Sequence, residues 1–352
     1  MDKSTKKRAT ITQVAKHAGV SVGTVSNYLN GTAGVSHDRA ARIQQAIDVL
    51  DYIPDTLASS LRRKDSTAIH VLTPHLDSAF YTNTISALMH DAYEAGYTVH
   101  ISGYEYSSEI ERQQLRALES SKPGTSIIIF NGFDDLTEIK RLAKKQIHVI
   151  MADRREIPGY TSSVIFDNRR VPFEITCLLK NRNYKRIGLF TEPTKLQNIR
   201  ERVEGFLEAM KYFGYPDPEK NIYSRPDLSL DKLKNSYLYM MEILESSKRE
   251  ELPDAWLATS DYLAFGMMRA INEKGYSIPE DFAIVGYDNI EISGYVNPRL
   301  TTVEQDQKLF GRTLWSVITE YNKTGKYQSI ELPQKIKTVS YTHLRAHETK
   351  AN

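Results

Sequence analysis

The chain has 352 residues and a mass of 40.2 kDa, a length that predicts two or three domains. Its 40% hydrophobic and 26% charged residues exclude a disordered, collagen-like or coiled-coil chain. The net charge of +2 is unevenly distributed, because residues 1–65 carry ten Lys/Arg against six Asp/Glu, whereas residues 66–337 carry 34 against 37. A basic front ahead of a neutral body favours a nucleic-acid-binding module at the N-terminus.

Three helices are predicted in the first fifty residues. Thr12 is the expected N-cap of the first helix, and Gly19, which adopts a positive φ easily, is expected to end it. Ser21 is the expected N-cap of the second helix, so that about three residues join two helices at helix-turn-helix spacing. Ser36 is expected to cap a third helix. The apolar stripe that would close a small core over the first two helices consists of Ala40, Ile43, Ile47 and Leu50.

A short connecting segment follows the small helical domain, which we assign to residues 1–53. Residues 54–66 begin with Pro54, which suits a helix start, and leave room for a helix of only two turns before a linker. Helices this short are marginal in water, so we expect this hinge to be ordered only against a partner or against DNA.

From residue 67 to residue 337, short apolar runs alternate with amphipathic helical patterns. The helical patterns include Phe80–Ala95, Val203–Phe213 and Tyr262–Lys274. This alternation predicts an α/β core of two doubly wound parallel-sheet lobes, with a lobe boundary near Asp167 and a ligand cleft between the lobes. The apolar runs that we interpret as strands are 68–72, 97–102, 126–130, 148–151, 163–166, 186–190, 255–259 and 282–286.

The residues of both parts carry a family resemblance. The run ITQVAKHAGVSVGTVSNYLNG, followed by VSHDRAARIQQAIDVLDYIPDTLASSL, resembles the DNA-binding head and hinge of the lac-repressor (LacI/GalR) family of bacterial transcription regulators. The resemblance continues in DNRRV, IRERVEGFLEAM, ATSDYLAFGMMRAI, IVGYDNIEIS and PRLTTVEQD, and so covers essentially residues 10–337. It implies an all-α helix-turn-helix DNA-binding domain on a periplasmic-binding-protein-like core of two lobes.

The resemblance also implies a function. The expected protein is a sequence-specific transcriptional repressor that binds a pseudo-palindromic operator in double-stranded DNA as a homodimer. A small effector would control it allosterically, with a sugar or sugar phosphate expected first and a purine as the alternative. Some family members answer instead to a phosphocarrier protein, which stays open here as a co-regulator.

By this resemblance the second helix enters the major groove of DNA. Val22, Gly23 and Asn27 match the base-reading positions, and the Asn27 amide can pair bidentately with adenine. Many members carry arginine at the position of Asn27, so the departure changes the expected operator and not the binding mode. For two of the phosphate candidates, Thr24 and Ser26, the alternative is an ordinary surface of a helical bundle. The side chains expected to contact phosphates are Thr12, Ser21, Thr24 and Ser26.

Two hinge residues match the minor-groove contacts of the family. Leu61 corresponds to the apolar wedge that unstacks a base step and bends the DNA, and Ala58 lies one turn before it. The alternative is that Leu57 and Leu61 pack the two hinges of a dimer together, and we expect both roles to be shared between these leucines.

The body contains the residues that the resemblance assigns to effector binding. Asp167, Arg202 and Asp288 match the principal positions, and carboxylates with a guanidinium suit the hydroxyl groups of a sugar. Asp261 directly precedes a helical pattern, so its alternative role is that of an N-cap. Asn289 departs from the paired aspartates that are frequent in the family, which leaves the effector's identity open. The further candidates are Phe80, Phe206, Ser260 and Gln305.

Other function classes find little support in the sequence. It contains no GxxxxGK[ST], GxGxxG or HExxH motif, and one cysteine cannot build a thiolate metal cluster, so we expect no enzyme, no metal and no cofactor. The alternatives are a cytoplasmic carbohydrate-binding or carbohydrate-modifying protein without operator function, and an exported solute-binding protein. The N-terminal segment lacks the apolar stretch of a signal peptide, and no apolar run approaches the roughly 18 residues of a membrane span. We therefore expect a cytoplasmic protein without a membrane partner.

The last residues of the chain depart from the pattern of the body. Residues 339–348 read VSYTHLRAHE, which is the translation of a transposase-based sequencing adapter. We predict that residues 338–352 are a non-native, adapter-derived tail, and we exclude them from the interpretation of fold and sites.

Overall fold

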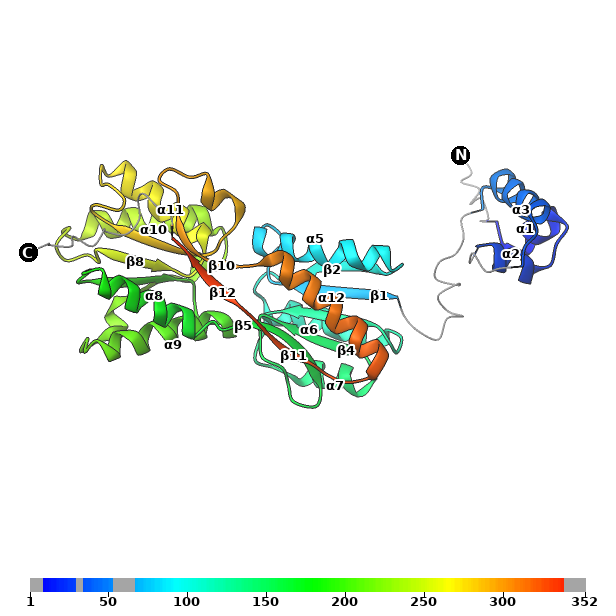
Figure 1. Ribbon diagram of the computed structural model, residues 1–352, viewed down its shortest axis with the longest axis horizontal. Helices are drawn as coiled ribbons and strands as arrows, with labels where there is room; N and C mark the ends of the chain where they lie inside the picture. The colour runs from blue at the N-terminus through cyan, green and yellow to red at the C-terminus, as the bar shows by residue number, and fades with distance from the viewer. Residues whose placement is uncertain (1–8, 30–33, 53–66, 339–352) are drawn as a thin grey trace, which may run out of the picture. The chain divides into compact units, whose positions relative to one another are not determined.

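The computed structural model describes residues 9–29, 34–52 and 67–338. The chain divides into two compact units, Met1–Ser66 and Thr67–Asn352, which we name the head and the body and describe separately (Figure 1). Within the described ranges, no helix combines the length and the apolar character that crossing a membrane requires.

The start of the first helix of the head differs from the prediction. Thr10, and not Thr12, is the N-cap of α1, because the Gln13 backbone N–H donates to Thr10 Oγ1 while the Gln13 side chain accepts from the Thr10 backbone N–H. Gly19 ends this helix with φ at 63°, as predicted. The helices among the described residues of the head are α1 Ile11–Ala18, α2 Val22–Leu29 and α3 His37–Leu50.

A small apolar core holds the three helices of the head together. Ser21 caps α2 as predicted, since its Oγ accepts from the Thr24 backbone N–H at 3.1 Å. Ser36 stands at the N-cap of α3, although its side chain forms no capping hydrogen bond with the described residues of that helix. Val22, at the start of α2, stays outside the core with 36% of its surface exposed. The buried core residues are Val14, Ala15, Ala18, Val25, Ile43, Ala46 and Tyr52.

The body begins with a six-stranded sheet in the order β11-β5-β4-β3-β1-β2, in which every neighbouring pair in the described part of the chain is parallel. Its inner strands are buried apolar runs, as expected for strands covered by helices on both faces. The strand bounds are β1 Ala68–Thr73, β2 Thr98–Gly103, β3 Ser126–Phe130, β4 His148–Ala152, β5 Thr161–Phe166 and β11 Ser329–Leu332.

The second sheet of the body, also six-stranded, has the order β12-β10-β9-β8-β6-β7. Its described pairs are parallel except that of β10 with β12, which is antiparallel. The strand bounds are β6 Ile187–Thr191, β7 Ile222–Ser224, β8 Ala255–Ala258, β9 Ala283–Asp288, β10 Thr301–Gln305 and β12 Gln334–Lys337.

Helices cover both faces of each sheet. In the first lobe, α5 and α12 pack on one face and α6 and α7 on the other; in the second lobe, α10 and α11 oppose α8 and α9. The predicted fold class, a helix-turn-helix head with a core of two doubly wound lobes, is confirmed. The helix bounds are α5 Ala79–Glu94, α6 Ser108–Ala117, α7 Thr137–Lys144, α8 Arg170–Asn181, α9 Gln197–Tyr212, α10 Lys232–Ser246, α11 Asp261–Glu273 and α12 Gln307–Thr324. The short 3-10 helices are η1 Leu118–Ser120, η2 Pro218–Asn221, η3 Pro226–Ser229 and η4 Glu291–Gly294.

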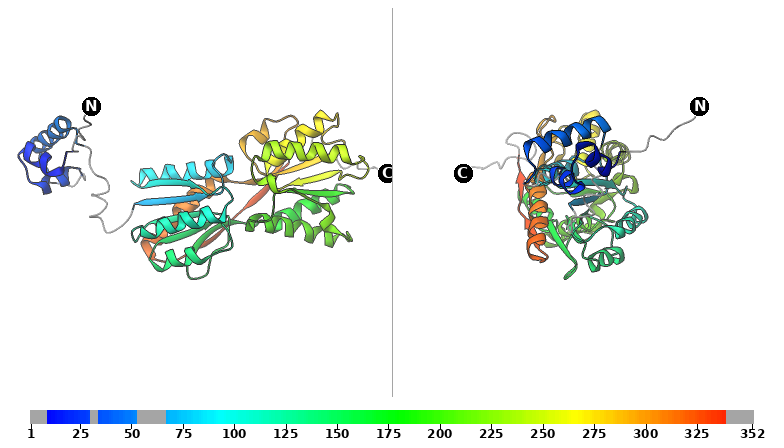
Figure 2. Two further views of the ribbon diagram at one scale, coloured as in Figure 1. Left: turned by 180° about the vertical axis from the view of Figure 1, so that it is seen from behind. Right: turned by 90° about the vertical axis from the view of Figure 1, so that its right-hand side faces the viewer.

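The chain passes between the two sheets more than once. After β5 it enters the second lobe, after β10 it returns to build α12 and β11 on the first, and between β11 and β12 it crosses again (Figure 2). The boundary expected near Asp167 lies at the first of these crossings. Each lobe is therefore assembled from segments that are distant in the sequence.

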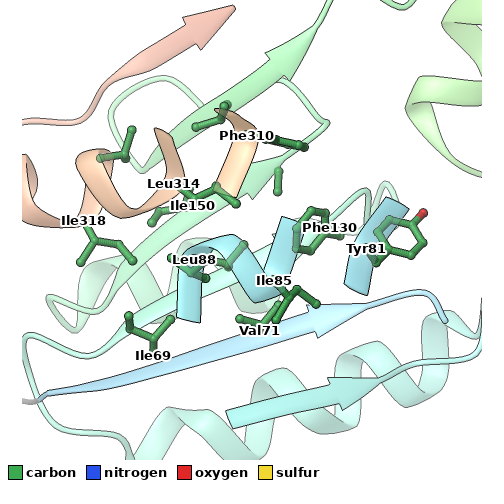
Figure 3. Packing of buried hydrophobic residues seen from close by; sticks show 14 of the residues in the cluster. Ile69, Val71, Tyr81, Ile85, Leu88, Phe130, Ile150, Phe310, Leu314 and Ile318 are labelled. Atoms are coloured by element: carbon green, nitrogen blue, oxygen red, sulfur yellow. The ribbon is translucent and has the colours of Figure 1, made fainter. Parts of the chain in front are cut away.

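The core of the first lobe fixes the start of α5, which the site requires. The Phe310 ring lies between the rings of Phe130 and Phe166, with centroid distances of 5.9 and 5.2 Å, while aliphatic side chains of α5 and α12 pack over β1 and β4 (Figure 3). Gly311 lets α12 approach α5 closely, because a Cβ atom there would come within 2.3 Å of the Thr84 carbonyl oxygen. Phe80, on the first turn of α5, also packs against Phe310 and is held by this contact.

Candidate functional site

The second helix of the head presents the predicted base-reading positions to solvent. Val22, Gly23 and Asn27 are all exposed on α2, whereas Val25 on the opposite side is completely buried. A Cβ atom on Gly23 would come no closer than 3.7 Å to Ser21 Oγ, so the surface there is open. The structure thus leaves one side of α2 available for contacts outside the head.

The predicted phosphate-contacting residues are less uniform. Thr12 is exposed on α1, and Ser26 is half-buried. Ser21 and Thr24 join their hydroxyl groups at 2.8 Å and so take part in the cap of α2. The two hinge candidates, Ala58 and Leu61, lie outside the described residues.

A pocket lies in the body where strands of both sheets end, which is the usual place for ligands in open parallel sheets. About 390 Å³ of its space is not filled by atoms, part of it open to solvent. Asp153 follows β4, Glu192 follows β6, Thr259 follows β8 and Asp288 ends β9, so four strands deliver polar groups to one place. The lining residues are Ser78, Phe80, Tyr81, Tyr106, Asp153, Glu192, Leu196, Asn198, Ile199, Arg202, Lys232, Thr259, Ser260 and Asp288.

Arg202, on α9, is the centre of the hydrogen-bond network in the pocket wall. Its Nε donates to Asn168 Oδ1 at 2.9 Å, its Nη1 donates to the Thr259 carbonyl oxygen at 2.6 Å, and its Nη2 donates to Gln305 Oε1 at 3.3 Å. The guanidinium carbon also lies 3.8 Å from the centre of the Tyr287 ring. Since Arg202 is only 4% exposed, these contacts fix the plane of its guanidinium group.

Two buried carboxylates face this guanidinium group. Asp153 Oδ2 lies 3.9 Å from Arg202 Nη2, and Asp288 Oδ1 lies 3.9 Å from Arg202 Nη1. Asp153 also accepts hydrogen bonds of 2.8 Å from the side chains of Asn168 and Asn198. Burial raises the pKa of Asp153 to about 6, although Arg202 and the two amides oppose the shift. Burial likewise raises the pKa of Asp288, against the effect of Arg202.

A second ion pair forms another part of the wall. Lys232 Nζ, at the start of α10, lies 2.6 Å from Glu192 Oε1, and Thr259 Oγ1 donates to Glu192 Oε2. Burial alone would raise the pKa of Glu192, but the charge and hydrogen bond of Lys232 lower it overall. Tyr106, from the loop after β2 in the first lobe, interacts with the ammonium group of Lys232 in the second. The ion pair itself lies within the second lobe, and the interaction of Tyr106 with Lys232 connects it to the first lobe.

Some predicted effector residues line the pocket and others do not. Phe80, Arg202, Ser260 and Asp288 lie in the wall, and Gln305 stands behind it as a hydrogen-bond acceptor for Arg202.

Two of the predicted effector residues, Asp167 and Phe206, lie outside the pocket wall. Asp167 is not among the lining residues, because its carboxylate accepts from the backbone N–H groups of Arg169 and Arg170 at 3.2 and 2.9 Å, at the start of α8. The adjacent Asn168 contacts Arg202 instead. Phe206 is completely buried in the apolar core between α8, α9 and the second sheet, away from the pocket.

Asp261 has a different role from both sequence interpretations. The N-cap of α11 is Ser260, whose Oγ accepts from the Leu263 backbone N–H, and Asp261 is the first residue of the helix. The buried Asp261 carboxylate accepts from the Ile290 backbone N–H at 3.0 Å and from the hydroxyl groups of Ser293 and Thr302 at 2.6 and 2.5 Å. It therefore fixes the chain that follows Asp288, the last residue of β9.

Sequence reasoning missed several residues of the pocket. Asp153 and Glu192 come two residues after the apolar runs 148–151 and 186–190, which predict strands, so their places near strand ends were a usable signal. Lys232 and Tyr106 had no such signal, because one begins a helix and the other lies in a loop. Their position depends on how the two lobes meet.

Comparisons with known proteins agree with the fold of the head and of the body. Residues 10–55 match the family of bacterial regulatory proteins, lacI family, and residues 177–336 match the periplasmic binding protein-like domain. The chain is 25% identical over 320 residues to the HTH-type transcriptional repressor PurR of Aliivibrio salmonicida (strain LFI1238), covering 91% of this chain and 94% of that one. It is 27% identical over 337 residues to PurR of Photorhabdus laumondii subsp. laumondii, covering 92% and 94%.

Solved structures show the same likeness. A lac repressor dimer bound to operator and the anti-inducer ONPF has a TM-score of 0.76 at 25% identity, covering 94% of this chain and 98% of that one. A lacI-family regulator from Silicibacter pomeroyi reaches a TM-score of 0.82 at 22% identity, covering 96% and 99%. The chain therefore has a lacI-family helix-turn-helix domain and a periplasmic-binding-protein-like domain, and it is similar along about nine-tenths of its length to HTH-type transcriptional repressors.

Proposed function

We propose that the protein is a repressor that binds a pseudo-palindromic operator as a homodimer and that a small sugar in the body controls this binding. The observation that carries the proposal is the exposed side of α2. Val22, Gly23 and Asn27 lie on this side and are open to solvent, whereas Val25 on the opposite side is buried in the core of the head. Ala58 and Leu61 complete the proposed DNA contacts from sequence alone.

The chemistry of the pocket supports a sugar as effector. Its wall offers carboxylate acceptors in Asp153 and Asp288 and donors in Arg202 and Lys232, which suit a ligand with many hydroxyl groups. Phe80 and Tyr81 add the aromatic surface against which the apolar face of a sugar ring can pack. A purine, the alternative, would leave more of these charged groups without partners.

Operator binding is tested with the full-length protein and its own promoter region in a fluorescence-anisotropy titration at moderate salt. We expect specific affinity well above that for a random duplex, and a change of about 5- to 150-fold when the effector binds, which is the usual range of allosteric coupling. Equal affinity for both duplexes under every ligand condition would contradict the proposal.

Replacing Asn27 with arginine is expected to change base preference at one position of each half-site from adenine to guanine. A bidentate contact to one base accounts for about 1–3 kcal/mol of discrimination, and arginine fits the acceptor pair of guanine. Binding to a library of operator variants measures the change. Gln45→Arg, on the exposed surface of α3, adds the same charge elsewhere in the head and should leave base preference unchanged. Equal weakening of Asn27→Arg on all sequences would argue against direct readout.

A further inference from the structure

The wall of the pocket contains more acidic than basic groups. Among the described residues that line it, Asp153, Glu192 and Asp288 are carboxylic acids, and Arg202 and Lys232 are cations. Four of the five side chains are nearly buried, with exposures between 2% and 8%, and Lys232 is 21% exposed. Water therefore screens these charges weakly, and their arrangement decides which ligand charge the pocket accepts.

Each cation already faces a carboxylate. Glu192 lies 2.6 Å from the ammonium group of Lys232, within direct ion-pair distance, and is itself oriented by the hydroxyl of Thr259. The Arg202 guanidinium group lies 3.9 Å from both Asp153 and Asp288. Three of its five N–H donors are engaged by the oxygens of Asn168, Thr259 and Gln305. Even with Asp288 protonated, Asp153 and Glu192 together balance the two cations.

We infer that this pocket selects an unphosphorylated ligand and that Glu192, by neutralising Lys232, is the residue that determines this selectivity. The inference rests on the proposed function, since it narrows the class of sugar that the same pocket takes. A phosphate group carries a charge of about −1.5 to −2 at neutral pH and needs cations that are not already paired. In this wall it would meet two cations that are already paired and one carboxyl group in excess, whereas neutral hydroxyl groups can bridge the same donors and acceptors.

Glu192→Gln keeps the shape of the side chain and the hydrogen bond from Thr259 but removes the negative charge beside Lys232. The probe is inorganic phosphate, followed by hexoses and their 6-phosphates as matched pairs, titrated into the full-length protein by calorimetry and thermal shift at constant ionic strength. We expect the wild-type protein to show no measurable affinity for phosphate. Glu192→Gln should bind phosphate at least about tenfold more tightly than the wild type, since one close like charge has been removed.

Asp153→Asn tests the same inference at the other cation, because it removes a carboxylate 3.9 Å from Arg202 and leaves the ion pair of Lys232 with Glu192 in place. It decides the question if Glu192→Gln does not fold. Glu245→Gln is the matched control: Glu245 is 60% exposed and pairs with Lys274 on the surface, so the same change of charge there should give no phosphate binding.

The inference is overturned if the wild-type protein binds phosphate or a hexose 6-phosphate as tightly as the parent sugar, or if both folded variants gain no affinity for phosphate. Neither result would affect operator binding by the head. A failure of specific operator binding would instead contradict the proposed function. The phosphate affinities of the wild type and the variants would still decide the inference about the pocket.

Discussion

Arg202→Ala is expected to lower the free energy of unfolding of the body by about 3–5 kcal/mol and to abolish effector binding. The reason is that two buried carboxylates, Asp153 and Asp288, lose the guanidinium group that they face. The variant also leaves the acceptors of Asn168, Thr259 and Gln305 without their donor. The loss of stability in Arg202→Ala therefore exceeds the loss expected on removing an ordinary surface ion pair.

Urea denaturation of the full-length protein measures the loss of stability, and the sugar-induced thermal shift measures binding. Arg200→Ala is the matched control on the same helix: Arg200 pairs with the 70%-exposed Asp134 at 2.8 Å, so we expect a cost within about 1 kcal/mol. Operator affinity of Arg202→Ala without effector should stay near that of the wild type, because the head is a separate compact unit with its own apolar core. A folded Arg202→Ala protein with an unchanged thermal shift would remove Arg202 from the effector site.

The sequence predicted the inner strands well because burial on both faces leaves a continuous apolar run. The run 126–130 is β3 residue for residue, and all of it is buried. The strands it missed lie at sheet edges or late in the chain. β10 carries Thr, Glu and Gln, and β7, β11 and β12 have only three or four residues with incomplete burial. Such strands are defined by their partners and leave little local pattern to detect.

The residues of the site were predictable where the sequence matches a position of the family. Arg202 and Asp288 were found through the family resemblance, and the structure brings them together in the pocket wall. Phe206 shows the limit: it lies four residues after Arg202, and the small rotation of the helix between them directs it into the core. The Lys232 and Glu192 pair joins α10 to the end of β6, forty residues apart, so only the folded lobe reveals it.

Ile43→Ala is expected to unfold the head and abolish operator binding while the body stays folded. Ile43, on α3, is completely buried and is one of the seven buried apolar residues that form the core in the described part of the head. Removing a buried isoleucine side chain costs about 2–5 kcal/mol, and a domain of this size has a total stability of only about 3–7 kcal/mol. The loss is therefore comparable to the whole stability of the head, because a small domain buries little apolar surface.

Differential scanning calorimetry separates the two units, and we expect the transition of the head to disappear in Ile43→Ala while that of the body is unchanged. Val49→Ala, on the same helix but 62% exposed, is the matched control and should keep both the transition and operator affinity within about 0.5 kcal/mol of the wild type. Because the head and the body are separate compact units, the sugar-induced thermal shift should survive in Ile43→Ala. Wild-type operator affinity in Ile43→Ala would contradict the prediction, because it would show that the exposed side of α2 does not depend on the core that contains Val25 and Ile43.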